Sequence, residues 1–409
     1  MWMSLAAWGE FGAAMVAACS QSGGDDAQPT ADARSTVTTT PTLEAATLVP
    51  IPEASATPTE SMTTLEATVW ADHPQVPILT YHRFLPDTYA QSTAVKTRLA
   101  DLQSHLERLY DSGYSLVPLG SWLAGDLRAP AGRRPLILTI DDAFFADQVS
   151  LTESGDPTPT SGIGVLWDFY REHPDFGFSA ALFANLGDKL FVGGEEALAT
   201  TIAWCLDHGV IPYNHFYAHP RLDLTETRWI TWEAQKNDLY LRELLASVGR
   251  SDLTSKLGNI LALPYGIWPE SQSGRDAVLG YVNPEGTPLQ AVMEVDYAYR
   301  ARLAAAPYSE DFDRLHVPRI VATLSAIKVL EEWLDTLPAA SLCEIRIEDA
   351  STDGSEAWEE RIESARLDGC GPGIYVIGHS IYDALGTDVK RVFSDPSPGK
   401  GSCGDGCSD

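Results

Sequence analysis

Residues Pro135–Ile140 form a short apolar run, interrupted only by Thr139, that ends in two adjacent aspartates, Asp141 and Asp142. Apolar continuity of this kind is typical of a strand buried on both faces, as in parallel sheets covered by helices. In such α/β folds the functional site lies at the carboxyl ends of the strands. We therefore expect the aspartate pair at the functional end of a parallel sheet.

Further strands and helices are predicted along the chain, and their alternation is typical of an α/β fold. The predicted strands are Val76–Thr80, Tyr114–Val117, Ser179–Ala184, Val210–Tyr213, Ile260–Leu263 and Val317–Ala322. Leucine and isoleucine at three- and four-residue steps predict helices within Leu99–Leu109, Leu198–Leu206, Trp229–Val248 and Ala326–Leu337. Residues 143–178 exceed the usual βα connection of about 2–6 residues. They are expected to be largely surface loop, either a rim of a substrate groove or a tolerated insertion.

A second motif, Asn214–Pro220, follows the predicted strand Val210–Tyr213 and contains His215 and His219. The spacing of four residues can place both imidazoles on one side of a turn. One carboxylate and two imidazoles supply three protein ligands and leave a coordination position open, as catalytic zinc sites require. The remaining carboxylate of the aspartate pair can serve as a base. These residues predict a mononuclear metal hydrolase.

Composition limits the class of partner. The chain has 409 residues, 44% of them hydrophobic, which is enough for one large domain or two smaller ones. The net charge of −29 excludes nucleic acid as an expected partner, because the sequence lacks a basic stripe. A polyanionic substrate would also be repelled at long range. The sequence does not indicate an oligomeric state.

The N-terminal part has the character of an exported protein. In residues 1–19, small residues precede Cys19 as in a lipoprotein signal, although Glu10 interrupts the apolar segment and no basic residue comes before Cys19. Residues 20–70 are rich in Thr, Pro, Ala and Ser and are predicted to be a disordered tether. We expect a lipid anchor at Cys19, a folded catalytic domain over 71–338 and an acidic, Gly-rich C-terminal segment, 339–409, to which no fold is assigned.

The remaining cysteines predict disulfides in an oxidising compartment. Cys205 lies on the apolar face of a predicted helix and is expected in the core. Cys343 can pair with Cys370, and Cys403 with Cys407.

Taken together, the motifs resemble those of the polysaccharide deacetylases, carbohydrate esterase family four. The family motif Thr-Phe-Asp-Asp-Gly stands here as Thr139–Ala143, and His-Ser/Thr-x-x-His as the segment Asn214–Pro220. A third motif ends in Pro-Tyr-Gly, present as Pro264–Gly266. The opening Val76–His82 resembles the extracellular branch that acts on poly-N-acetylglucosamine. The resemblance covers about residues 75–325.

This resemblance implies a distorted (β/α) barrel with seven strands and an N-deacetylase of an amino-sugar polysaccharide, secreted or at the cell surface. It implies that Asp142, His215 and His219 hold a divalent metal, with Zn²⁺ expected and Co²⁺, Ni²⁺ or Mn²⁺ also suitable. Asp141 would be the base, and a backbone N–H, that of Tyr265, would stabilise the oxyanion. The acid that protonates the leaving amine would be His82, with His379 as the rival. Tyr217 and Trp268 are expected to contact the substrate.

Two departures from the family pattern leave alternatives open. Ala143 replaces the family glycine, and a positive φ there would strain it. The arginine that many members carry before Pro264-Tyr265 is absent, so the group that orients Asp141 is not identified. One alternative is a glycan-binding protein that keeps the metal and has lost turnover. Another is a hydrolase for peptidoglycan or another N-acylated compound.

Overall fold

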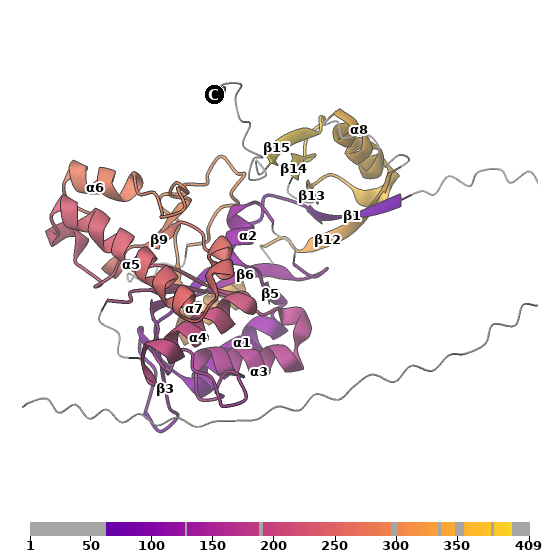
Figure 1. Ribbon diagram of the computed structural model, residues 1–409. Coiled ribbons are helices and arrows are strands. Elements are labelled where there is room, and N and C mark those ends of the chain that lie inside the picture. The colour runs from indigo at the N-terminus through magenta and orange to yellow at the C-terminus, as the bar shows by residue number, and fades with distance from the viewer. Residues whose placement is uncertain are drawn as a thin grey trace, which may run out of the picture. The chain divides into compact units, whose positions relative to one another are not determined.

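The computed structural model describes residues 63–126, 129–187, 191–295, 302–333, 337–347, 356–377 and 380–394 (Figure 1). Its main sheet has the order β10-β9-β8-β7-β6-β2-β11, with β5 beside β6. All of these pairs are parallel. The strands are β2 (Ile78–Tyr81), β5 (Tyr114–Leu116), β6 (Arg134–Ala143), β7 (Ala180–Ala184), β8 (Val210–Asn214), β9 (Ile260–Ala262), β10 (Ala291–Met293) and β11 (Ile320–Val321).

The two ends of this sheet approach each other. Met293 in β10 forms a parallel bridge with Val317, just before β11. The backbone N–H of Val317 donates to the carbonyl of Val292 (3.0 Å), and that of Glu294 donates to the carbonyl of Val317 (2.9 Å). Because β11 also pairs with β2, the seven strands of the main path curl into a distorted (β/α) barrel. The expected fold class is confirmed.

Helices follow most barrel strands. They are α1 (Leu99–Asp111), α2 (Leu119–Leu123), α3 (Gly162–Glu172), α4 (Gly194–Asp207), α5 (Thr227–Ser247), α6 (Gln272–Leu279), α7 (Leu324–Glu332) and α8 (Glu356–Ala365). The expectation that 143–178 is largely loop is wrong for α3. Ser161 caps this helix, its Oγ accepting a hydrogen bond from the N–H of Gly164. Ile163, Leu166 and Phe169 form its buried face. Among the described residues, none of the helices is both long and apolar enough to cross a membrane.

Side chains along β6 alternate between two cores, as the period of two in a strand requires. Leu136 and Leu138 belong to the apolar cluster that also contains the buried faces of α1, α3 and α4. Ile137 belongs to a second cluster, shared with residues of the neighbouring strands, that fills the barrel interior. Thr139 and Asp141 continue the inward series begun by Ile137. The alternation therefore brings a carboxylate into the barrel at the end of β6.

A second, antiparallel sheet has the order β12-β1-β13-β14-β15. Its strands are β1 (Thr63–Trp70), β12 (Ala340–Ile347), β13 (Ile374–Ile377), β14 (Ser380–Asp383) and β15 (Lys390–Ser394). Figure 1 shows the indigo β1 between C-terminal strands drawn in orange and yellow. The predicted tether 20–70 is therefore wrong over 63–70, because alternate residues there, such as Ala67 and Val69, are buried against the C-terminal segment. The signal and the rest of the tether lie outside the described residues.

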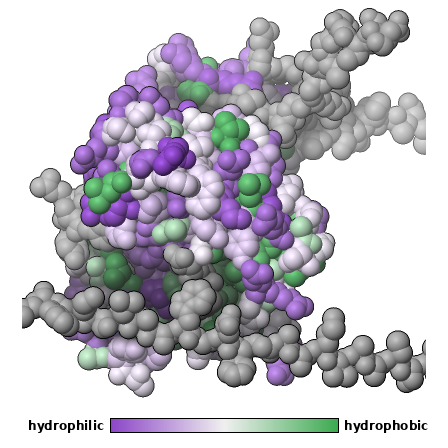
Figure 2. All heavy atoms as spheres, turned by 60° about the vertical axis from the view of Figure 1, so that its left-hand side comes forward, coloured by the Kyte–Doolittle hydropathy of each residue, from purple (hydrophilic) through white to green (hydrophobic). Residues whose placement is uncertain are grey.

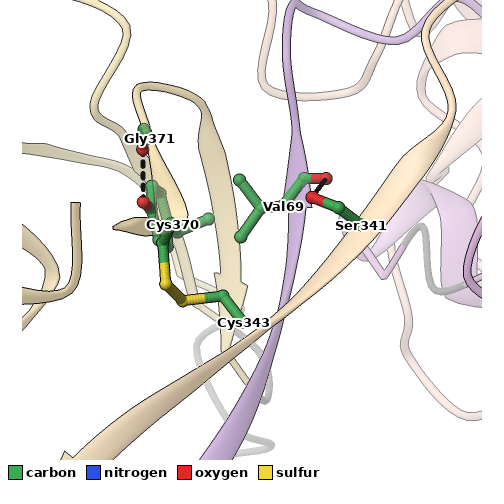
Figure 3. Close-up of a disulfide and its surroundings, with 6 residues drawn as sticks. Val69, Ser341, Cys343, Cys370 and Gly371 are labelled. Carbon is green, nitrogen blue, oxygen red and sulfur yellow. Dashed lines mark hydrogen bonds between the residues drawn. A yellow bond between two sulfur atoms is a disulfide. The ribbon is translucent and has the colours of Figure 1, made fainter. Parts of the chain in front are cut away.

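The second sheet has a small core of its own and a disulfide. Cys343 in β12 bonds to Cys370 after α8, as the sequence predicted (Figure 3). Beside this bond, the Ser341 hydroxyl donates to the carbonyl of Val69 at 3.3 Å, which ties β12 to β1. Cys205 is buried as expected, in the cluster between the sheet and the surrounding helices, while Cys403 and Cys407 lie outside the described residues.

The surface shows no continuous apolar face in the view of Figure 2. Strongly apolar residues form small separate patches there among hydrophilic ones. Single exposed apolar residues are normal on soluble domains.

We predict that the second sheet requires its N-terminal strand. A chain starting at Asp72 loses β1, including Trp70, which is fully buried in the cluster that also fills the barrel. Replacing one buried tryptophan by alanine typically costs about 3–5 kcal/mol. Loss of the whole strand should lower the unfolding free energy by more than this. Urea unfolding followed by circular dichroism measures this. A chain starting at Thr59 is the control, and equal stability of the two would contradict the role of β1.

Candidate metal centre and its surroundings

The predicted catalytic and metal-binding residues meet at one end of the barrel. Asp141 and Asp142 are near the end of β6, His215 directly follows β8 and His219 lies four residues further on. They line a cavity of about 420 Å³ whose lining residues are His82, Arg83, Val95, Lys96, Asp141, Asp142, His215, His219, Leu263, Tyr265 and Val295. The carboxyl ends of several strands thus supply one site, as expected for a barrel of this kind.

Asp142, His215 and His219 form a cluster suited to a metal ion. One potential ligand atom from each lies within 4.8 Å of the others. Asp142 Oδ1 is 3.5 Å from His219 Nε2 and 4.0 Å from His215 Nε2. The Asn185 amide is 3.5 Å from the same oxygen. A carboxylate and two imidazoles are donors that zinc and similar divalent ions accept, so the residues present fit such an ion.

His215 is held in the orientation and charge state that a ligand needs. Its Nδ1 is 2.9 Å from the carbonyl oxygen of Ala262, which leaves Nε2 directed toward Asp142. Burial lowers the pKa of His215 to about 4, and the opposing effect of Asp141 is smaller. The imidazole is therefore neutral at pH 7. Neutral imidazoles with the second nitrogen bound to a carbonyl are typical metal ligands.

Asp141 is fixed by a residue that the sequence analysis missed. The guanidinium of Arg319 forms a two-pronged ion pair with it, Nη1–Oδ1 2.6 Å and Nη2–Oδ2 2.8 Å. Arg319 also donates to the Thr139 hydroxyl and, through Nε, to the carbonyl of Glu294. Burial alone would raise the pKa of Asp141. Arg319, together with His215 and His82, outweighs burial and lowers it to about 2, so Asp141 is ionised.

Arg319 takes the place of the arginine whose absence was a departure from the family pattern. It comes from the segment before β11, and not from the residues before Pro264-Tyr265. A signal was present in the sequence: Arg319 stands two residues after Val317 in an otherwise apolar strand, on the side that faces the barrel. A charged residue at such a position needs a buried partner.

The site loops contain unusual backbone conformations. In the described part of the chain, the residues other than glycine with clearly positive φ are Asp142 (57°), Phe216 (60°), His219 (53°) and Tyr265 (60°). Left-handed backbone costs about 1–2 kcal/mol per residue and is concentrated at functional sites. Ala143 does not have a positive φ, so the replacement of the family glycine by alanine introduces no such strain.

His82 and Tyr265 both line the cavity, and their catalytic roles stay predictions. His82 directly follows β2 and is 7% exposed. Gln148 donates to the carbonyls of His82 (2.6 Å) and Asp141 (2.8 Å), which ties the ends of β2 and β6 together. The Tyr265 ring packs 4.5 Å from the ring of His219, centroid to centroid. His379, the rival acid, lies outside the described residues.

Tyr217 and Trp268 are not among the residues that line this cavity. Tyr217 turns away from its neighbouring histidines and packs against α5, 5.8 Å from the ring of Trp232. The Trp268 indole donates to the Glu294 carboxylate (2.6 Å), which also bonds to His316 Nδ1 (2.7 Å). Their predicted contacts with substrate stay predictions.

The chain matches no protein-family profile and no curated protein sequence. It is similar to solved structures of polysaccharide deacetylases. The deacetylase PplD of Streptococcus pyogenes, in complex with acetate, has 16% identity and a TM-score of 0.40, over 63% of this chain and 98% of its own. IcaB from Ammonifex degensii has 18% identity and a TM-score of 0.43, over 64% and 98%. A polysaccharide deacetylase from Bacillus cereus has 17% identity and a TM-score of 0.43, over 64% and 69%. Values this low leave the activity to be argued from the site itself.

We predict that His219→Ala weakens zinc binding by about a hundredfold or more. Losing a residue that only hydrogen-bonds to a metal ligand already costs about 10–100-fold in affinity. His316→Ala is the matched control, because this histidine is paired with Glu294 outside the cluster. Isothermal titration of the metal-free protein measures both affinities. Equal zinc binding by the two variants would exclude His219 as a ligand.

We also predict that Arg319→Ala destabilises the metal-free protein by about 3–5 kcal/mol at pH 7, because it leaves Asp141 buried without a partner. The Asp141 pKa of about 2 lies below the ordinary 3.8, so its contribution to stability is present above pH 3.8 and lost as pH falls toward 2. In the variant, burial raises this pKa, so the difference in unfolding free energy between wild type and variant should shrink on acidification.

Urea unfolding at several pH values measures that difference. The control is Arg83→Ala, which removes a half-exposed ion pair with Asp147 at the cavity and should cost about 1 kcal/mol or less. A loss for Arg319→Ala no larger than for the control, or one independent of pH, would refute the role assigned to the buried pair.

Proposed function

We propose that this protein is a metal-dependent hydrolase that removes N-acetyl groups from an amino-sugar polysaccharide at the cell surface. The observation that supports it most is the juxtaposition, in one cavity, of an ionised carboxylate and a separate three-residue metal cluster. Asp141 is bound by Arg319, while its neighbour Asp142 belongs to the cluster. The proposal that the group removed is acetyl and that the substrate is an amino-sugar polysaccharide rests on the motif resemblance.

Metal binding and proton transfer are assigned to different residues of the cavity. A divalent ion bound by Asp142, His215 and His219 would lower the pKa of water and polarise the acetyl carbonyl. Asp141 accepts the proton of the attacking water, and Arg319 keeps its carboxylate oriented and ionised.

His82, which directly follows β2, would protonate the leaving amine, because it lines the same cavity as Asp141 and the metal cluster. Tyr265 presents its backbone at the rim in a left-handed conformation, and its N–H is the proposed oxyanion donor.

The alternative of a binding protein without turnover was motivated by Ala143 and the absent arginine. Arg319 supplies a guanidinium to Asp141. Ala143 has no positive φ and still pairs with Ala184, although the register of β6 against β7 shifts between Ile140 and Ala143. Neither departure therefore favours that alternative. The Cys343–Cys370 disulfide supports an oxidising compartment and hence export. A lipid anchor at Cys19 remains part of the proposal.

We predict acetate release from N-acetylglucosamine oligomers by the full chain, abolished by a chelator and restored by Zn²⁺. Asp141→Asn should slow release about 10²–10⁴-fold, as expected for loss of a general base, and should keep the metal. Asp175→Asn, a half-exposed carboxylate outside the cavity, is the control. Enzymatic detection of acetate measures the rates.

Release that is insensitive to the chelator, or equal in Asp141→Asn and wild type, would refute this mechanism. Release from peptidoglycan and not from the oligomers would retain the hydrolase and change its substrate.

A further inference from the structure

Aromatic side chains, two of them exposed and others half-buried, follow one side of α5, the helix that comes after the loop of the metal-binding histidines. Trp229 and Trp232 are 45% and 43% exposed, and their ring centroids are 5.7 Å apart. In the described ranges no other tryptophan is as exposed. Tyr240 continues the series eight residues after Trp232, with Lys236 between them. We call Trp229, Trp232, Tyr240 and the adjoining Tyr217 the aromatic ridge.

The ridge is joined to the loop that carries the metal ligands. Tyr217 stands between His215 and His219 in sequence, and its ring lies 5.8 Å from Trp232 and 6.2 Å from Tyr240. Its N–H donates to the carbonyl of Glu233 (3.2 Å), and the N–H of Ala218 donates to the Glu233 carboxylate (2.7 Å). The aromatic surface is therefore held in a fixed position relative to the cavity.

The loop after β7 also leaves room for this surface. A Cβ at Gly187 would lie 2.7 Å from Cδ1 of the Tyr217 ring and 2.6 Å from the Tyr217 carbonyl oxygen. Glycine at this position lets the backbone approach the tyrosine closely, and Gly187 donates its N–H to that carbonyl at 2.7 Å. The ring of Tyr217 is thus packed between the loop after β7 and the aromatic residues of α5.

Trp229 and Trp232 lie outside the packed face of α5, whereas Tyr240 is partly buried against the main apolar cluster. The packed face of α5 consists of other residues, Ile230, Ala234, Asn237, Asp238, Leu241, Leu244 and Leu245. Aromatic rings that remain exposed beside polar side chains suit ligands with both apolar and hydroxyl-rich surfaces. Lys236 lies 5.8 Å and 5.6 Å from the rings of Tyr217 and Tyr240, so a charged donor is interleaved with the rings. A purely apolar partner would not match this alternation.

We infer that the aromatic ridge is a second binding surface for the glycan chain whose acetylated unit occupies the cavity. The inference rests on the proposed function and adds a surface outside the cavity. Sugar rings would stack on Trp229, Trp232 and Tyr217, while Lys236 bonds to their hydroxyl or acetyl oxygens. A glycan that is long enough to reach from the cavity to α5 gains these contacts, and a short oligosaccharide does not.

The test compares substrates of two lengths with the full-length protein. The double variant Trp229→Ala/Trp232→Ala should lower kcat/KM about tenfold on an N-acetylglucosamine polymer, because stacking contacts of this kind change binding by about one order of magnitude. It should leave kcat/KM on the trimer of N-acetylglucosamine unchanged. Trp229→Phe/Trp232→Phe keeps aromatic faces and should restore most of the loss. Leu367→Ala, which truncates a side chain that is 74% exposed and remote in sequence, is the neutral control.

A second readout does not depend on turnover. In the Asp141→Asn background, co-sedimentation with insoluble N-acetylglucosamine polymer should be about tenfold weaker for the double alanine variant. If the wild type binds the polymer through the tryptophans but releases no acetate, the surface stands and the proposed function fails. If acetate release is present and the variant matches wild type on both substrates and in co-sedimentation, the surface is refuted.

Other occupants of the ridge give different results. An equal loss on polymer and trimer would indicate a general effect on the site and refute the second surface. Loss of self-association in analytical ultracentrifugation, with glycan binding unchanged, would assign the ridge to a second copy of the chain and likewise refute it.

Discussion

The buried ion pair between Arg319 and Asp141 is the interaction on which the site depends. A carboxylate this deeply buried would be neutral without a partner, and an arginine inside a barrel would be equally costly alone. Together they connect the segment before β11 to the end of β6, and a further bond from Arg319 reaches the carbonyl of Glu294 after β10. The pair therefore fixes the charge of Asp141 and joins three strand ends where the barrel closes.

The remaining strand ends are held by uncharged side chains. The side-chain NH₂ of Asn237 in α5 donates to the backbone carbonyl of Ala184 in β7 (2.7 Å) and to the side-chain Oδ1 of Asn214 in β8 (3.2 Å). Its Oδ1 accepts a hydrogen bond from the N–H of Leu186 (2.9 Å). The metal-ligand loop starts from this fixed point and turns through left-handed residues. Strain of this kind persists only where the surroundings over-determine the backbone. The site is thus organised before any ligand enters.

Local sequence patterns predicted a parallel α/β sheet, and the motif resemblance predicted its closure into a barrel and most of the cavity residues, because each strand and each motif occupies consecutive residues. The failures involve partners that are distant in the chain. Arg319 follows Asp141 by 178 residues. The alternation of side chains along a strand indicates that Arg319 faces the barrel interior, but not which carboxylate it pairs with. The strand Thr63–Trp70 has the composition of the tether before it and is ordered by pairing with Ala340–Ile347. Trp268 follows Pro-Tyr-Gly closely in sequence, yet its indole bonds to Glu294.

The position of β1 also sets an order of events during synthesis. Trp70 pairs with Ala340 on one side and with Ile374 on the other, so the first strand of the folded chain waits for the last strands to be made. All barrel strands, up to Val321, precede β12 and can associate while β1 is still unpaired. Such distant pairing slows folding. The second sheet therefore closes last, and a chain that stops before residue 374 would leave one edge of β1 unpaired and open to pairing with another chain.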